Sequence, residues 1–379
     1  MFTGSSAFAG DDASVMSSMS ARLIAVSGLG PKEPAAFVVE AEGRRLLLDC
    51  GAGPEPGRLP DFDAIGRIDA VLLSHGHNDH AGALRFRDRI GTPPVYATAP
   101  AITRLPDGIA THPIPIRGRA QVLGIGIQTG PDGHAPGGVW LRLEVGEGLI
   151  YMGDHCVESA LYRFAPPPAT ATMIFDASYG DAEATQEAQR SALAEMAAEG
   201  PLLLPVPADG RGPEIATFMQ EAGFDVAVDD AVCAVATLLT RAARESAKPA
   251  GVPALQRLIG EARGLDAEAP ASGVMVAHGG SGDVGVAAAL IRRWGGERDP
   301  AIVFTGHLPA GTAGRKLVDS GRALFRRWNV HPTFSQNVQL IESVDPRRVV
   351  PAFGDSRCYP VWRERLAPRE VITSKVTEL

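Results

Sequence analysis

The chain has 379 residues, of which 45% are hydrophobic, and its formal net charge is −8 at pH 7. This length and composition exclude a disordered chain and predict one or two globular domains. An acidic chain lacks the overall positive charge with which proteins coat nucleic acids, so a nucleic acid would bind only in a local basic cleft.

Cysteine spacing and the length of apolar runs indicate in which cellular compartment the protein is expected. The four cysteines have no C-x-x-C spacing, which argues against a disulfide framework and against a thiolate zinc site. Residues 1–20 lack the basic and apolar regions of a signal peptide and are expected to form a mobile tail. No apolar run reaches the roughly 20 residues that span a bilayer. We therefore expect a cytoplasmic protein with no membrane partner.

The first predicted elements are short strands. The apolar runs RLIAVSG, AAFVVEAE and RRLLLDCG are separated by glycine, proline and the turn at Glu42 and Gly43, a pattern that predicts a β-meander. IDAVLLSH predicts a further strand, and HAGALRFRDRI after it predicts a helix. The turn at residues 146–148 predicts a hairpin between VWLRLEV and LIYMGD.

From about residue 183 strands and helices alternate. TQEAQRSALAEMAAEG predicts a helix that ends at Gly200, followed by the strand PLLLPV and the helix PEIATFMQEAG. The alternation continues through GVMVAH, DVGVAAALIRRW, AIVFTG and a helix over AGRKLVDSGRALFRRW. Such alternation predicts a small parallel sheet. RRVVPAFGDS predicts one more strand.

The densest group of metal-capable side chains lies in LLSHGHNDHAG. His75, His77, Asp79 and His80 follow a buried strand, and a loop is needed to let all four side chains converge. Neutral imidazole and carboxylate groups suit zinc and similar divalent ions. The alternative is a solvated loop in which Asn78 or Asp79 caps a helix. So many titratable groups in six positions need a compensating ion, which favours the metal site.

This H-x-H-x-D-H stretch resembles the signature of the metallo-β-lactamase superfamily, and three further stations follow in that family's order. LLLDCG presents Asp49, GHAPGG presents His134 and YMGD presents Asp154. The resemblance implies the following ligands: His75, His77 and His134 for one ion, Asp79 and His80 for a second, and Asp154 as a bridge between them. It also implies that Asp49 supports the loop from behind. Taken alone, Asp49 could equally be a turn residue and Asp154 could equally end a hairpin. The order in which all the motifs follow one another favours the metal site.

The later segments resemble the β-CASP branch, metal-dependent nucleases of the RNase J and cleavage and polyadenylation endonuclease type. IFDASYGDA, which contains Asp176, is similar to the branch's acidic station. GPLLLPVPADGRGPEIATFM, GVMVAHGGSGDVG and IVFTGHLPAGTAGRKL are similar to its other segments. The resemblance extends from about residue 22 to 356 and implies an α/β fold, an αββα sandwich with an inserted α/β β-CASP-like cap domain. The expected parts are a tail at 1–20, the lactamase domain at 21–180, the cap at 181–325 and the closing part of the lactamase domain at 326–379.

Two histidine stations of this branch are missing. FSQN has Asn337 where the branch carries a proton-transferring histidine, and PAFG has Phe353 where it carries a ligand. Asn337 is expected to hydrogen-bond to Asp176, but an amide cannot move a proton at neutral pH. The second ion would then keep three protein ligands plus water, or only the first site would fill. Residues from which a replacement ligand could come are His155, His307 and Asp355.

Candidate substrate-binding residues lie mostly in the cap: His278, Gly280, Ser281, Arg315 and Asn337. The glycines of GGSGDVG match a dinucleotide fingerprint only superficially, because the next acidic residues precede the following strand instead of ending it. The N–H groups of this loop could receive a phosphate, and the alternative is a tight turn required for packing.

The most basic stretch of the cap could line a path for a phosphodiester backbone, or form a solvated helix face. Its members are Arg315, Lys316, Arg322, Arg326 and Arg327. Phe325 and Trp328 could stack on bases, although helical spacing favours core packing. His112 and His331, each followed by proline, show no interpretable pattern.

Together these patterns predict a metallo-hydrolase with one or two zinc ions, with manganese or iron as alternatives. The resemblance implies a phosphodiesterase that acts on RNA or single-stranded DNA through a metal-bound hydroxide. The implied catalytic carboxylates are Asp49, Asp79, Asp154 and Asp176. The acidic charge keeps two alternatives open, namely a small-molecule ester, lactone or phosphoester hydrolase and a metal-stabilised binding protein without catalysis. The sequence also leaves open a homodimer.

Overall fold

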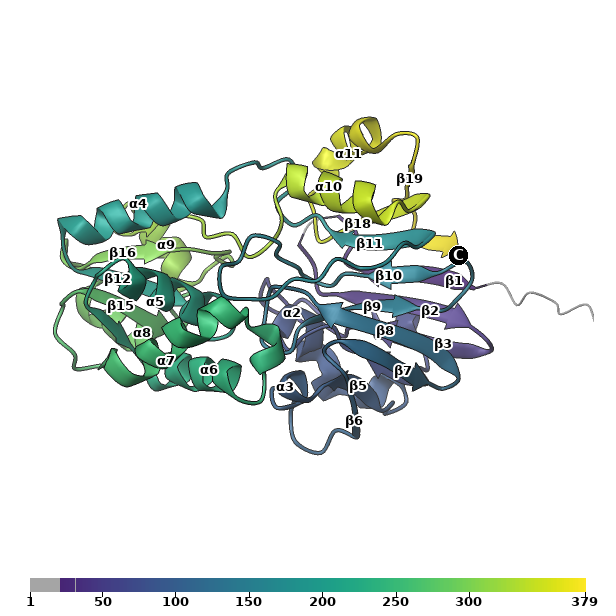
Figure 1. Cartoon of the computed structure of the whole chain (residues 1–379), viewed down its shortest axis with the longest axis horizontal. Helices are drawn as coiled ribbons and strands as arrows, with labels where there is room; N and C mark the ends of the chain where they lie inside the picture. The colour runs from purple at the N-terminus through teal and green to yellow at the C-terminus, as the bar shows by residue number, and fades with distance from the viewer. Residues whose placement is uncertain (1–20, 31) are drawn as a thin grey trace, which may run out of the picture.

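The computed structural model describes residues 21–30 and 32–379. The expected tail at residues 1–20 lies outside the described residues. Figure 1 shows two bodies side by side, a sandwich that carries the C-terminus and a second body of sheet and helices. None of the described helices combines the length and the apolar character needed to cross a membrane.

The sandwich contains two seven-stranded sheets. The first sheet has, in spatial order, β20 (Val376–Glu378), β1 (Arg22–Ser27), β2 (Ala36–Ala41), β3 (Arg44–Leu48), β4 (Ala70–Leu72), β5 (Val95–Thr98) and β6 (Thr111–Ile114). The second has β19 (Glu370–Val371), β18 (Arg348–Ala352), β11 (Thr172–Asp176), β10 (Leu149–Tyr151), β9 (Val139–Leu143), β8 (Ile125–Pro131) and β7 (Gly118–Val122). Alternate side chains of both sheets meet in one apolar core, which includes Phe37, Leu48, Leu141 and Tyr151.

Helices cover both outer faces of the sandwich. The face of the first sheet carries α1 (Phe62–Ile65), α2 (Asn78–Ala81), α3 (Ala99–Ile102) and the 3₁₀ helix η1 (Gly82–Ile90). The face of the second sheet carries α10 (Phe334–Val344) and α11 (Tyr359–Leu366), with the short 3₁₀ turn η4 (Ser356–Cys358) before α11. The layers are therefore helix, sheet, sheet and helix, which confirms the predicted αββα sandwich.

A third sheet of six strands is entirely parallel. Its spatial order is β14 (Arg263–Gly264), β13 (Val226–Val228), β15 (Val274–His278), β12 (Leu202–Val206), β16 (Ala301–Phe304) and β17 (Leu324–Phe325). Its helices are α4 (Gln186–Glu199), α5 (Arg211–Glu221), α6 (Asp230–Thr240), α7 (Val252–Glu261), α8 (Gly285–Trp294) and α9 (Ala313–Asp319), with 3₁₀ turns η2 (Arg244–Ser246) and η3 (Pro249–Gly251). Separate apolar clusters fill its two faces, as a parallel sheet buried on both sides requires.

The elements from α4 to β17, here called the inserted unit, lie between two strands that pair directly with each other. β11 and β18 are parallel neighbours, with Asp176 opposite Ala352. The chain therefore leaves the second sheet at Asp176, builds the inserted unit and returns to the next position in the same sheet. This connection brings loops of the inserted unit against the end of the sandwich where β11 stops.

Several predicted elements are confirmed. β1, β2 and β3 form the antiparallel meander, β9 and β10 form the hairpin, and α4 ends at Gly200. Two helix predictions were wrong. The segment after the histidine cluster is a 3₁₀ helix broken at Phe86, and the helix predicted through Trp328 stops at Asp319.

The second of these errors has a local cause. Gly321 has a positive φ of 70°, which ends helical geometry, and Leu324 then pairs with Val303 of β16. Phe325 is consequently exposed at the edge of the sheet, whereas Trp328 is fully buried. The core role predicted for these aromatics is therefore correct for Trp328 and wrong for Phe325.

Candidate metal centre

The histidine loop begins where β4 ends and turns into α2. Backbone hydrogen bonds hold it against the segment after β3, since Ala52 N donates to Asn78 O at 2.8 Å and Cys50 N donates to His80 O at 2.7 Å. Gly51 is required at this contact because an added Cβ would lie 1.7 Å from Asp79 O. The close backbone approach fixes the direction in which the histidine side chains point.

Three imidazoles converge on one point. His77 Nδ1 lies 3.1 Å from both His75 Nε2 and His134 Nε2. His134 donates from Nδ1 to Val330 O at 2.7 Å, which leaves its Nε2 lone pair facing the other two rings. Nitrogen atoms this close are accommodated if neutral rings share a cation.

The pKa values of these rings favour the neutral, ligating form. Burial is the largest cause and lowers the pKa of His75 and His77, and it lowers that of His134 to about 3. Neighbouring imidazoles lower these pKa values further, because one charged ring would repel the next. The chemistry of this donor set therefore fits a divalent metal ion at neutral pH.

Beside the three imidazoles, His80 and Asp154 form a buried pair. His80 Nε2 lies 3.1 Å from Asp154 Oδ1, and the same carboxylate lies 3.7 Å from His134 Nε2. Burial alone would raise the pKa of Asp154, but the charges of His80 and His331 hold it well below its usual range. Asp154 is thus an anion shared by two converging ligand groups, one with His75 and His80 and one with His134 and His331.

Asp79 points into the same cavity but is not part of any converging ligand group within residues 21–30 and 32–379. Its Oδ2 lies 3.8 Å from Lys32 Nζ. Burial would raise the pKa of Asp79, but the charges of His80 and Lys32 outweigh that effect and lower it.

Asp49 lies behind the loop and is fully buried. Its carboxylate accepts hydrogen bonds from Ser74 N at 2.7 Å, Ser74 Oγ at 2.7 Å and Tyr151 Oη at 2.6 Å, and its Oδ2 lies 2.7 Å from His80 Nδ1. With Nδ1 engaged in this way, His80 directs Nε2 toward Asp154. Asp49 therefore orients His80 and the start of the loop together.

His331 is a residue of the centre that no sequence pattern indicated. Its Nδ1 lies 2.7 Å from Asp176 Oδ2 and 3.7 Å from Asp154 Oδ2, and its ring centroid is 5.2 Å from that of His134. The usable sequence signal was its place six residues before Asn337, close to the missing histidine station. His331 lies in the loop between the inserted unit and α10, and the path of this loop places it at the end of β11.

Asn337 and Phe353 occupy the positions of the two missing histidines. Asn337 Nδ2 donates to the backbone oxygen of Asp176 at 2.7 Å, and the side chain is buried away from the cavity. The expected hydrogen bond to Asp176 therefore exists, but it reaches the main chain. Phe353 is buried with its ring edge-on to His80, at a centroid distance of 5.2 Å.

The three residues considered as replacement ligands lie apart from one another. His155 is fully buried and stacks on Phe164. His307 lines the cavity and pairs with Glu55 at 3.0 Å. Asp355 is paired with Arg357 outside the cavity. None of the three belongs to a converging ligand group in the described part of the chain.

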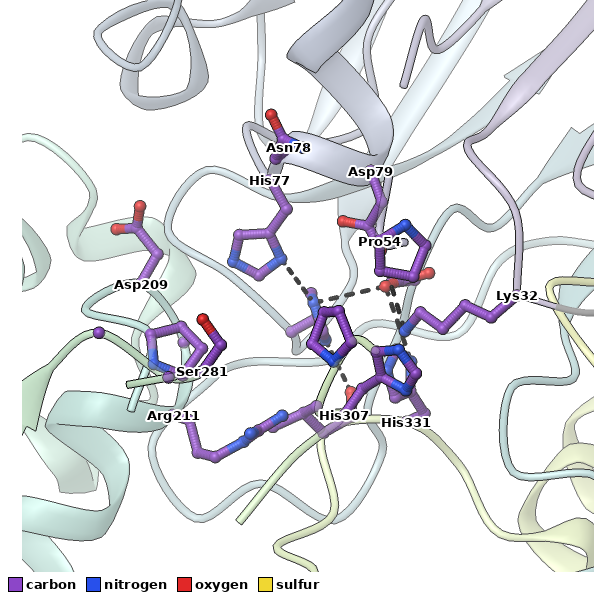
Figure 2. A pocket seen from close by; sticks show the side chains of 18 of the residues that line it. Lys32, Pro54, His77, Asn78, Asp79, Asp209, Arg211, Ser281, His307 and His331 are labelled. Carbon is purple, nitrogen blue, oxygen red and sulfur yellow. Dashed lines mark hydrogen bonds and ion pairs between the residues drawn. The ribbon is translucent and has the colours of Figure 1, made fainter. Parts of the chain in front are cut away.

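The centre opens into a cavity of about 370 Å³ between the sandwich and the inserted unit. Figure 2 shows residues that line it: His77, Asn78 and Asp79 at the top, Asp209, Arg211 and Ser281 from the inserted unit on the left, and Lys32, His307 and His331 toward the right. His278, Gly280 and Ser281 also line it, as their proposed substrate role requires. Gly280 has a packing role too, since an added Cβ would lie 2.9 Å from Pro207.

Arg315, by contrast, does not line this cavity. It bonds to Leu308 O and faces Asp319 on its own helix. Arg211 is the inserted unit's guanidinium that reaches the cavity, and the sequence interpretation did not single it out. The sequence feature that could have indicated Arg211 is the GR pair in the loop after β12.

Comparisons with known proteins show which families and proteins the chain is similar to. Residues 29–197 match the family model described as the metallo-beta-lactamase superfamily. The chain is 28% identical over 342 residues to Ribonuclease TTHA0252 of Thermus thermophilus, covering 75% of this chain and 78% of that protein. It is 27% identical over 255 residues to Transcription termination factor FttA of Methanothermobacter thermautotrophicus, covering 53% of this chain and 40% of that protein. It is 22% identical to Integrator complex subunit 11 of Gallus gallus, covering 87% and 68%.

A solved structure of a protein of unknown function from Enterococcus faecalis V583 superimposes with a TM-score of 0.60 at 16% identity, covering 95% of this chain and all of the other. It supports the fold alone. Residues 29–197, which carry the histidine loop, His134 and Asp154, thus resemble the metallo-β-lactamase superfamily. The six-stranded inserted unit and the relatives are consistent with the predicted resemblance to the β-CASP branch. It spans about two fifths of the length of the termination factor that it matches.

Proposed function

We propose that the protein is a metal-dependent phosphodiesterase that cleaves RNA. The observation that carries this proposal is the convergence of His75, His77 and His134, in their neutral form, on a cavity walled by the inserted unit. Relatives named as a ribonuclease and as a transcription termination factor support RNA as the substrate class.

The residues present fit a divalent ion, and we propose zinc, because zinc prefers histidine ligands in a set of three with one open position. His75, His77 and His134 would hold this ion, and Asp79, His80 and Asp154 would be the ligands of a second one. Manganese and iron suit similar donor sets. When bound, the metal supplies the polarisation of the phosphate and the activation of water.

The chain's own groups perform the remaining tasks. Asp154 and Asp79 orient the reacting groups, and Asp49 keeps His80 in position. The pair of Asp176 Oδ2 and His331 Nδ1 can hold a proton at the edge of the centre and deliver it to a leaving oxygen. Arg211 and Ser281, on the opposite wall, can bind a phosphate of the strand.

A small-molecule ester, lactone or phosphoester hydrolase is the second candidate. The observation that favours it is the modest volume of the cavity, about 370 Å³, together with the acidic net charge of −8. A metal-stabilised binding protein without catalysis is the third. We also propose a cytoplasmic location, because the four cysteines are all free thiols in the structure, as expected in a reducing compartment.

The test is a cleavage assay with zinc-loaded protein on labelled single-stranded RNA, single-stranded DNA, a bis-aryl phosphate and a simple aryl ester. The controls are His77→Ala, which removes a ligand, and His112→Ala, which changes an exposed histidine on β6. RNA cleavage that His77→Ala abolishes and His112→Ala retains supports the proposal. Turnover of the ester alone supports the second candidate. The absence of any turnover, with unfolding on chelation, supports the binding protein, and light scattering of the same samples decides whether the chain is a homodimer.

A further inference from the structure

A second cavity of about 750 Å³ lies between the sandwich and the inserted unit and shares no lining residue with the metal centre. Four arginines line it. Arg117 and Arg163 come from the sandwich side, and Arg241 and Arg244 come from the end of α6 and from η2. One carboxylate, that of Glu245, accompanies them.

The four guanidinium groups are not neutralised by the chain itself. No ion pair or side-chain hydrogen bond joins any of them to another residue within the part of the chain that the structure describes, although 20 ion pairs occur elsewhere in it. Positive charges from two separate bodies repel one another across a shared cavity. An anion that enters the cavity would replace this repulsion with attraction.

The walls of this cavity are held together by the backbone. Arg163 N donates to Ser246 O at 2.8 Å, Lys248 N donates to Leu161 O at 2.8 Å, and Tyr162 forms an isolated bridge with Ala247. These bonds fix the segment that carries Arg163 against the segment that carries Arg244. The arrangement is therefore a preformed site with a fixed spacing of its backbone, unlike a chance meeting of surface side chains.

We propose that this arginine-lined cavity binds the phosphodiester backbone of a single-stranded RNA whose scissile bond lies at the metal centre. The inference rests on the proposed function. Guanidinium groups bind phosphate oxygens in a bidentate manner, and positively charged grooves hold single strands without reading their sequence. The location favours a strand over a free anion, because both cavities are lined by residues of the sandwich and of the inserted unit.

The experiment measures the affinity of catalytically inactive His77→Ala protein for a labelled oligoribonucleotide by fluorescence anisotropy over a series of salt concentrations. The test variant adds Arg241→Glu and Arg244→Glu. The matched control adds Arg85→Glu and Arg292→Glu, which change the net charge equally at exposed arginines that line neither cavity. We expect the test variant to bind at least about tenfold more weakly, and its salt slope to fall by about 0.7 for each phosphate that the protein no longer neutralises.

Each outcome decides the proposal. Equal affinity of the test variant and the matched control overturns it. Binding of inorganic pyrophosphate by the parent but not by the test variant, with RNA affinity unchanged, assigns the cavity to a free polyphosphate and also overturns it. If the parent protein shows no RNA binding at all, the proposed function itself fails. Circular dichroism of all proteins verifies that they fold alike.

A second inference starts from Lys32. Its ammonium group lines the metal cavity 3.8 Å from Asp79 Oδ2, and Figure 2 shows the side chain pointing inward from the right, toward His331. The Lys32 ammonium therefore lies beside a carboxylate that the resemblance assigns to a second ion.

Phe353 lies beside His80, at the position where the branch carries a ligand. Phe353 lies at the end of β18 with a positive φ of 62°, and its ring packs against Phe37 and His80. A bulky residue with this backbone geometry is strained, so the surrounding core holds it in place. Its phenyl ring presents no donor atom to an ion.

We infer that the Lys32 ammonium supplies the positive charge of a second ion and that the protein holds one metal ion, at His75, His77 and His134. A compact ammonium group can neutralise Asp79 without the fourth ligand that Phe353 denies to a metal. This inference concerns the metal centre alone and does not depend on the substrate.

The experiment is elemental analysis of metal per chain after equilibration with zinc and removal of the excess, on three proteins and one control. We expect one ion for the wild type, one for Phe353→His and two for the double variant Lys32→Met with Phe353→His, whereas Lys375→Met behaves as the wild type. Two ions in the wild type, or in Phe353→His alone, overturn the inference. If the Phe353 variants do not fold, anomalous scattering from zinc-soaked wild-type crystals decides. One peak at the three histidines supports the inference, and a second peak beside Asp79 overturns it.

Discussion

His331 Nδ1 lies 2.7 Å from Asp176 Oδ2, although the two residues are 155 positions apart in the chain. The pair places an imidazole beside Asp154 at the edge of the metal centre. The segment around Asp176 resembles the acidic segment of the β-CASP branch. In that branch, the histidine that partners the acidic residue belongs to the segment that reads FSQN in this chain. This chain supplies an imidazole from six residues earlier, and Asn337 bonds to the backbone of Asp176 instead.

Substitution of His331 tests this pair. We expect His331→Gln to lower kcat for RNA cleavage about 100-fold, since a positioned acid–base group contributes roughly that much or more. Zinc content should remain that of the wild type, because the proposed ligands His75, His77 and His134 stay in place. The measurement is single-turnover cleavage together with elemental analysis. His112→Gln is the control, and a variant that cleaves as fast as this control would refute the role.

Removal of the metal tests the centre. We expect a chelator to lower the Tm of the wild type by several degrees and to have little effect on His77→Ala, because an ion that binds only the folded state stabilises it by mass action. The neutral state of His75, His77 and His134 leaves three lone pairs without a cation in the metal-free protein. Differential scanning fluorimetry with and without added zinc checks this. Equal chelator effects on both proteins would show that the stabilising ion binds elsewhere.

Asp49 is expected to be required for stability. Asp49→Ala leaves Ser74 N, Tyr151 Oη and His80 Nδ1 without their buried acceptor, which should cost about 3–5 kcal/mol of unfolding free energy. Asp63→Ala, at an exposed carboxylate, should change it by less than about 0.5 kcal/mol. Urea denaturation of the two variants provides the comparison. A loss for Asp49→Ala as small as that of the control would show that the carboxylate is dispensable.

His155 gives a pH dependence with a definite sign. Burial is the main cause that lowers its pKa to about 4 from an ordinary value of 6.5. A lowered pKa means that the unfolded state binds a proton that the folded state does not. The contribution of neutral His155 to the unfolding free energy is therefore complete above pH 6.5. It is lost at about 1.4 kcal/mol per pH unit as pH falls from 6.5 toward 4.

The corresponding variant is His155→Gln, which cannot take up this proton. We expect the unfolding free energy of the variant to depend less steeply on pH between pH 4 and 6.5. The difference in slope should correspond to about one proton fewer taken up on unfolding. Urea denaturation at half-unit pH steps in the presence of a chelator measures it. Parallel curves for the two proteins would contradict the burial of a neutral imidazole at this position.

Much of this molecule was readable from the amino-acid order. Local patterns settled the meander, the β9–β10 hairpin, the parallel alternation of the inserted unit and the histidine loop, because each depends on residues close together in the chain. The prediction of a helix through Trp328 was wrong because local helical spacing competed with pairing to a distant strand. Leu324 pairs with Val303 across the sheet, and that pairing overrode helical spacing.

What the sequence by itself determined was the set of donor atoms: six side chains in a recognisable order, of which three become neutral once they are buried together. The tertiary structure alone decided what surrounds them. His331 reaches Asp176 only because β11 and β18 are neighbours, Lys32 meets Asp79 only through the packing of the loop before β2, and four arginines share a cavity only because two bodies meet there. Spacing along the chain encodes contacts within one element, whereas these contacts arise from packing between elements, which no local pattern records.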